Sequence, residues 1–158
     1  MKKIVMTAMA AATALSISSV QAADSVDIPL TGELAKSCDI SAFLNGPFDA
    51  IDMTTTDSQG AESLSVNCNY GGSASVTFES DNAGKMVSGS NEVPYKFILT
   101  GSGSPFENGV SLATAQTWNG FPAVANTDQT RGMSIQLDSA ATVAGTYEDT
   151  ITATVQPN

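Results

Sequence analysis

The sequence has 158 residues, a formal net charge of −10 and no histidine. This length suits one domain with a hydrophobic core of its own. The acid excess argues against nucleic acid and anionic membrane surfaces as partners, because both need clustered cations. Without histidine, the Ser-His-Asp and Cys-His forms of catalysis and the usual zinc ligands are excluded, so we expect neither a metal nor a cofactor.

The first residues predict export from the cytoplasm. Met1-Lys2-Lys3 is basic, residues 4–20 are apolar or small, and Val20-Gln21-Ala22 places small residues at positions −3 and −1 of a signal-peptidase site. We therefore expect residues 1–22 to be a signal peptide, cleaved between Ala22 and Ala23. A membrane anchor is disfavoured because the segment is only weakly apolar, and no later stretch is long enough to span a bilayer.

Two cysteines, Cys38 and Cys68, follow the predicted signal peptide. In an oxidising compartment a disulfide between them is the favoured state, and it would close a loop of about 30 residues. Free thiols and a metal site are the alternatives. The metal site has little support, because the chain contains neither histidine nor a CxxC motif.

The rest of the chain alternates apolar and polar residues in short segments, which is typical of strands with one buried face. Residues 26–34 alternate weakly, because Pro29 and Gly32 interrupt them. Residues 41–60 read as a long irregular connection. Residues 64–68 and 74–78 alternate strongly on either side of Gly71-Gly72 and predict a hairpin.

Further alternation predicts strands at 93–99 and 133–137, with turn signals at Asn108-Gly109 and Asn119-Gly120. The clearest strand is the last, residues 144–155, where Tyr147, Ile151, Ala153 and Val155 share one face. Seven or eight such strands and no convincing helix predict an all-β sandwich or barrel.

Few residues are candidates for chemistry or ligand binding. The acid pairs Glu148-Asp149 and Glu79/Asp81 resemble those of glycoside hydrolases in composition only, and such pairs are usually solvated or in turns. Trp118 and Tyr95 could form a sugar-binding platform, although a lone tryptophan in a sandwich is more often part of the core. No catalytic residue is predicted, and we expect that the protein is not an enzyme.

Several segments together resemble the spore-coat-protein-U-like domain of bacteria, which is found in subunits of archaic chaperone–usher pili. The similar segments, in chain order, are Ser37–Ile40, Leu64–Cys68, Gly84–Met86, Val93–Leu99 and Ala144–Val155. The resemblance implies an immunoglobulin-like antiparallel β-sandwich that lacks its last strand. A periplasmic chaperone and then the N-terminal extension of the next subunit would fill the open groove, and an outer-membrane usher would export the growing fimbria.

Transferred to this chain, the resemblance implies a donor strand in residues 23–34, which would insert Val26, Ile28 and Leu30 into a neighbour's groove. Ile151, Ala153 and Val155 would line the acceptor groove of a single domain, residues 35–158. In the other interpretation, residues 26–34 are the first strand of the protein's own sheet. The chain ends Gln156-Pro157-Asn158, where such subunits usually carry an aromatic residue, so we expect chaperone docking there to differ.

Three functional hypotheses follow from the sequence. The first is a structural subunit of a cell-surface pilus that supports adhesion or biofilm formation. The second is a stand-alone secreted or periplasmic binding module, lectin-like or adhesive, that uses Trp118, Tyr95 or nearby loops. The third is a small hydrolase that uses the acid pairs.

Overall fold

A computed structural model describes residues 24–44 and 46–158, so the predicted signal peptide and its cleavage between Ala22 and Ala23 lie outside the described residues. The described chain falls into two units, residues 24–33 and Leu34–Asn158. Residues 24–37 contain no helix or strand, and the first strand begins at Cys38. Within the described residues, no helix is long and apolar enough to cross a bilayer.

The unit Leu34–Asn158 is built from strands and one short 3-10 helix, η1. In chain order the elements are β1 (Cys38–Phe43), η1 (Pro47–Ala50), β2 (Ser58–Cys68), β3 (Gly72–Ser80), β4 (Lys85–Ser88), β5 (Asn91–Leu99), β6 (Val110–Ser111), β7 (Gln116–Ala123), β8 (Gln129–Leu137) and β9 (Ile151–Pro157).

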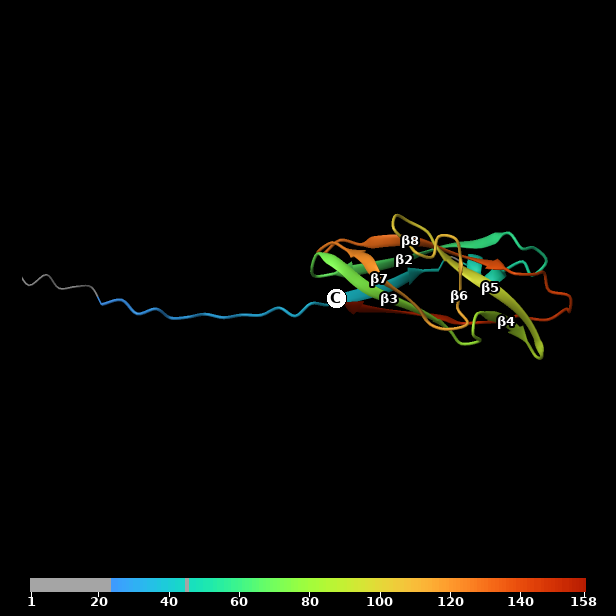
Figure 1. The fold of residues 1–158 in the computed structure, drawn as a ribbon, viewed down its shortest axis with the longest axis horizontal. Helices are drawn as coiled ribbons and strands as arrows, with labels where there is room; N and C mark the ends of the chain where they lie inside the picture. Colours follow the sequence, from blue (N-terminus) through green and yellow to red (C-terminus); the bar gives the residue numbers. More distant parts are fainter. Residues whose placement is uncertain (1–23, 45) are drawn as a thin grey trace, which may run out of the picture. The chain divides into compact units, whose positions relative to one another are not determined.

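These strands form two antiparallel sheets that pack as a sandwich (Figure 1). The larger sheet has the strand order β1-β2-β8-β5-β4, and β6 pairs with β5. The smaller sheet has the order β7-β3-β9. The predicted all-β, sandwich-like fold is therefore confirmed.

The core lies between the sheets and consists of the apolar residues that alternate along each strand. Phe78 of β3 is fully buried and packs against Phe97 of β5, with ring centroids 4.7 Å apart. Phe106 meets the same Phe78 ring edge-on at 5.9 Å. Because side chains in a strand point to opposite faces in turn, the intervening polar residues face water.

The hairpin expected across Gly71-Gly72 is wrong. β2 pairs with β1 and β8 in the larger sheet, whereas β3 pairs with β7 and β9 in the smaller sheet. The glycines therefore connect one layer to the other. Both strands bury their apolar face in the same core, so alternation predicts each strand but cannot identify its partner.

The two Asn-Gly signals have different outcomes. Asn108-Gly109 lies in a turn, where Gly109 has φ of 81° and donates its N–H to the carbonyl of Phe106 at 3.0 Å. Asn119-Gly120 lies inside β7, at a register shift opposite β3, so the predicted turn there is a bulge.

The last strand is shorter and later than expected. It starts at Ile151 instead of Ala144 and continues to Pro157. Before it, Glu148 forms only an isolated bridge with Val87. The predicted alternation is present within the strand, with Ile151, Ala153 and Val155 half-buried and the threonines between them exposed.

Cys38 and Cys68 form a disulfide, 30 residues apart in sequence. The two residues are also register partners, so the bond ties the start of edge strand β1 to the end of β2. No free cysteine occurs among the described residues.

We expect replacement of Cys38 and Cys68 together by serine to lower the free energy of unfolding by about 3–4 kcal/mol, because a closed loop of this length restricts the unfolded chain. Urea denaturation of oxidised wild type and of the double variant measures the difference. Equal unfolding free energies would contradict this account of the bond.

Candidate functional site

One side of the sandwich is open between the edge strands of the two sheets. Among the described residues, β1 pairs only with β2, and β9 pairs only with β3. β1 and β9 approach each other without forming a ladder. Each therefore presents a row of backbone N–H and C=O groups with no strand partner.

The two edge strands run in opposite directions along this opening. The chain just before β1 meets the end of β9, where Lys36 Nζ donates a hydrogen bond to the backbone oxygen of Asn158. The end of β1 and the start of β9 line one hollow together. The opening is therefore a groove with two different ends.

At the end of the groove formed by late β1 and early β9 lies a hollow of about 420 Å³. Its walls carry small side chains, Ala42 on β1 and Ala153 on β9, and its floor is the apolar core. Lining residues include Ile40, Leu64, Phe78, Met86, Tyr95, Met133, Ile135 and Ile151. A cavity of this size and composition fits apolar side chains.

Phe48 of η1 also lines the hollow, and a glycine places it there. Gly60 in β2 has φ of +74°, and a Cβ on it would lie 2.2 Å from the Phe48 ring. A larger residue would be strained at this φ and would push the ring away.

The predicted acceptor residues take different positions. Ile151 and Ala153 line the hollow, whereas Val155 lies outside its lining and packs against the core. The predicted donor residues Val26, Ile28 and Leu30 are 82%, 75% and 92% exposed. None of residues 24–34 belongs to a described strand, whereas the other interpretation expected the first strand of the sheet in residues 26–34.

Asp149 fixes the start of β9 at the rim of the hollow. Its Oδ1 accepts hydrogen bonds from the backbone N–H groups of Asn82 and Thr150 at 3.0 and 2.8 Å. Its Oδ2 accepts from the hydroxyl groups of Ser80 and Tyr95, both at 2.6 Å. Four donors satisfy the carboxylate, so it serves as a structural anchor and not as a free acid.

Burial raises the pKa of Tyr95 well above its ordinary value of 10, and the hydrogen bond to Asp149 raises it further. The side chain is 2% exposed, so its charged form would be poorly solvated. Tyr95 therefore joins the core of the larger sheet to the start of β9 as a neutral hydrogen-bond donor.

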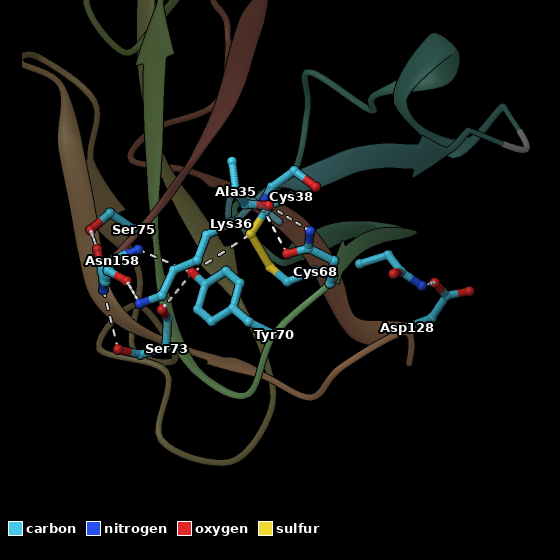
Figure 2. Close-up of a disulfide and its surroundings, with 12 residues drawn as sticks. Ala35, Lys36, Cys38, Cys68, Tyr70, Ser73, Ser75, Asp128 and Asn158 are labelled. Atoms are coloured by element: carbon cyan, nitrogen blue, oxygen red, sulfur yellow. Dashed lines mark hydrogen bonds between the residues drawn. A yellow bond between two sulfur atoms is a disulfide. The ribbon is translucent and has the colours of Figure 1, made fainter. Parts of the chain in front are cut away.

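The other end of the groove is closed by a cluster around the last residue (Figure 2). Tyr70 Oη donates to the carbonyl of Ser73 at 2.8 Å and accepts the N–H of Asn158 at 3.0 Å. Lys36 Nζ lies 4.7 Å from the centroid of the Tyr70 ring and donates to Asn158. The Asn158 side chain is held by Ser75, at 2.7 Å, and by two further contacts to β3 and β7.

Residues 35–37 continue the line of β1 beside this cluster. Asn69 accepts the N–H of Ser37 at 2.9 Å, donates its backbone N–H to the Ser37 carbonyl at 3.0 Å, and donates its side-chain amide to the Ala35 carbonyl at 2.8 Å. The disulfide follows directly at Cys38. The chain therefore enters the domain along a fixed path.

The aromatic pair considered for sugar binding is buried. Trp118 is 7% exposed, packs against Phe121 at 4.9 Å and lies under the guanidinium of Arg131, 5.8 Å away. Tyr95 is in the core as described. Neither ring presents a face to solvent, because both belong to the inward series of their strands. A binding platform made of these two residues is therefore not present.

The acid pair Glu148-Asp149 does not form a catalytic constellation either, and Glu79 and Asp81 of the other pair are exposed. Asp149 is saturated with donors, and Glu148 is exposed, with its backbone engaged by Val87 and Asn82. Within the described residues, no group of three or more histidine, cysteine or acidic side chains could hold a metal ion.

Two parts of the site, the cluster around Asn158 and the hydrogen bonds of Asp149, were not predicted from the sequence. Tyr70, Asn69 and Asn158 were not predicted, because their partners lie far away in sequence. Asp149 carried a signal, since it breaks the apolar alternation just before Ile151. A polar residue on the buried face of a predicted strand indicates buried hydrogen-bond donors around it.

The Spore Coat Protein U domain model matches residues 25–154, so the chain belongs to this family. The family is structural and pilin-like rather than catalytic, and its domains are known in archaic chaperone–usher pilus subunits. No curated protein sequence matches the chain.

We expect Tyr95→Phe to lower the free energy of unfolding at neutral pH by about 1–3 kcal/mol, because it removes a hydrogen bond to a carboxylate. A raised pKa in the folded state gives stability that is present below pH 10 and is lost as the pH rises above the unfolded value. Urea denaturation at neutral pH and above pH 10 should show a shallower decline for the variant than for wild type.

Tyr147→Phe is the matched control, since that hydroxyl donates only to the Val143 carbonyl, at 2.9 Å. If Tyr147→Phe reduces the loss of unfolding free energy above pH 10 as much as Tyr95→Phe does, the buried Tyr95 hydroxyl is not the cause of that loss.

Proposed function

We propose that this protein is a structural subunit of a bacterial surface fibre, assembled by a chaperone and an usher through donor-strand exchange. Residues 23–34 of one copy are the donor strand, and the groove between β1 and β9 of the next copy is the acceptor. Val26, Ile28 and Leu30 enter the groove, and Ile151, Ala153 and Val155 form its β9 wall. The resulting fimbria supports adhesion or biofilm formation.

The observation that carries this proposal is the match between an open groove and an exposed segment in one chain. The groove has an apolar floor, a hollow of about 420 Å³ and two edge strands whose outer edges are unpaired among the described residues. The segment carries three large aliphatic side chains at alternate positions, all exposed. In an isolated monomer, both the open edges and the exposed aliphatic side chains favour aggregation. Insertion of the segment into the groove of another copy would bury both.

The physical basis of the exchange is strand addition. The inserted backbone would hydrogen-bond to the free edges, and its alternate side chains would fill the hollow and set the register. One copy gives a segment and receives another at a different surface. Such a head-to-tail contact does not close, so repetition builds a filament.

The partners and the location follow from the same chemistry. A subunit with an open apolar groove needs a periplasmic chaperone to cover it before assembly, and an outer-membrane usher to order the exchange. The disulfide-bonded domain is consistent with an extracytoplasmic location. The buried Trp118 and Tyr95 leave the lectin-like alternative without its proposed platform.

The first test compares mature protein with and without residues 23–31. The full chain should form rods or denaturant-resistant multimers, and the truncated chain should remain monomeric while it binds a peptide of residues 23–34. Electron microscopy and sedimentation velocity measure assembly, and fluorescence anisotropy measures peptide binding. Two equally stable monomers would rule out the fibre.

A substitution within the donor segment tests the same idea in the full chain. Ile28→Asp should abolish multimers, because a carboxylate would have to enter an apolar hollow. Asp27→Ala, at the neighbouring position on the opposite face of the segment, is the matched control and should assemble normally.

The second test fills the acceptor groove. Ala153→Leu puts a larger side chain into the hollow that the donor needs, so peptide affinity should fall by at least about tenfold, the equivalent of about 1.4 kcal/mol. Thr152→Leu adds similar bulk to the exposed face of the same strand and should bind the peptide as wild type does. Equal loss in both variants would show that the inward face of β9 does not line the binding site.

A further inference from the structure

This inference rests on the proposed function. If donor strands are exchanged between copies, insertion of a segment into its own groove competes with insertion into another copy. Under that function, the donor segment is joined to a domain whose groove accepts the same segment from another copy. A segment on a short flexible linker reaches a nearby site at an effective concentration in the millimolar range, about a thousandfold above a micromolar solution of free protein. Fibre formation therefore requires that the chain hinder insertion of its own segment.

Strand direction excludes one way of self-insertion. β1 and β9 run in opposite directions, because the start of β1 meets the end of β9. All ladders among the described residues are antiparallel. A donor strand antiparallel to β9 would therefore lie parallel to β1. Parallel strands need a connection of about a dozen residues or more. Only residues 31–37 separate Leu30 from Cys38, so the chain is too short.

A tight reversal is the remaining way. The segment would turn within residues 31–34 and run back antiparallel to β1, entering the groove at the end where the chain joins the domain. Pairing with β9 would then be parallel, which is only slightly weaker per residue. Direction and linker length alone do not prevent this insertion, so another feature has to obstruct it.

The Lys36 side chain lies across that entrance. It starts on the strand-like path of residues 35–37, which Asn69 holds in line with β1 by three hydrogen bonds. From there it passes over the Tyr70 ring, and its Nζ donates to the backbone oxygen of Asn158 at the end of β9. Figure 2 shows Lys36, Tyr70 and Asn158 together beside the disulfide.

Lys36 therefore connects the two walls of the groove at one end only. The opposite end, between Ala42 and Ile151, contains the apolar hollow and has no comparable bridge among the contacts of the described residues. A segment that arrives from another copy can enter at that end or along the length of the groove. A segment that turns back from residue 35 must pass the bridge.

We propose that Lys36 is a positioning residue that closes the groove at the end where the chain enters the domain, so that the donor segment completes a second copy instead of its own. The cation suits this position, because an ammonium group is attracted to the face of the Tyr70 ring and carries three donors, one of which reaches the backbone oxygen.

The test uses the full mature chain with Lys36→Met, which gives an unbranched side chain one atom shorter and removes the charge and the donors. We expect at least a tenfold smaller multimer fraction than in wild type by sedimentation velocity. The monomers should show protection of residues 26–30 from hydrogen exchange that does not depend on protein concentration. They should also bind the 23–34 peptide at least tenfold more weakly, because their groove is already filled.

Two further variants make the result specific. Lys85→Met removes the same charge from a surface pair with Glu92, at 2.6 Å, and should assemble as wild type does. Lys36→Arg keeps a cation that can reach the same partners and should restore the multimers. Protection of the β3 and β5 amides, measured in the same exchange experiment, shows that each variant is folded.

The outcomes separate this inference from the proposed function. If wild type forms multimers and Lys36→Met forms them equally, the role of Lys36 is wrong and donor-strand exchange stands. If Lys36→Met is monomeric but residues 26–30 exchange freely, self-insertion is also overturned. If wild type neither assembles nor binds the peptide, the proposed function and this inference fail together.

Discussion

The open edge of the structure depends on the position of β9, which among the described residues pairs with β3 alone. β9 pairs along its length with β3, and β1 pairs with β2, so in the part of the chain that the structure describes each sheet ends on a strand whose other edge is free. The two free edges lie beside each other, and the core between them reaches the surface as an apolar hollow. Because burial of apolar area is the main stabilising term in a small domain, an unfilled groove leaves stability to be gained by a bound strand.

The two ends of this groove are built from different chemistry. At one end, small side chains and an apolar floor leave space. At the other end, the disulfide ties the start of β1 to the end of β2, and hydrogen bonds hold Asn158 to Tyr70 and to Ser75 of β3. The two ends of the groove are therefore not equivalent. A strand from outside would find space for its side chains at the apolar end and a hydrogen-bonded cluster at the other end.

The acidic residue at the groove shows how a charged side chain can serve the fold alone. Asp149 lies on the rim of the hollow, a position in which a carboxylate could be taken for a catalytic acid or base. Its four hydrogen bonds come from a turn, from β3, from β5 and from Thr150 just before β9. They leave it no free lone-pair direction for a substrate. The carboxylate therefore fixes where β9 begins, and this in turn places Ile151 and Ala153 in the wall.

The sequence by itself determined the class of fold, the disulfide and the inward face of β9. Alternation at Ile151, Ala153 and Val155 is a local property, because successive strand residues point to opposite faces whatever their partner. Only the tertiary structure decided which strands pair, since a buried face is equally apolar in either sheet. For this reason the prediction of a hairpin across Gly71-Gly72 was wrong. Lys36, Tyr70 and Asn158 are far apart in the chain, so only the folded structure brings them together.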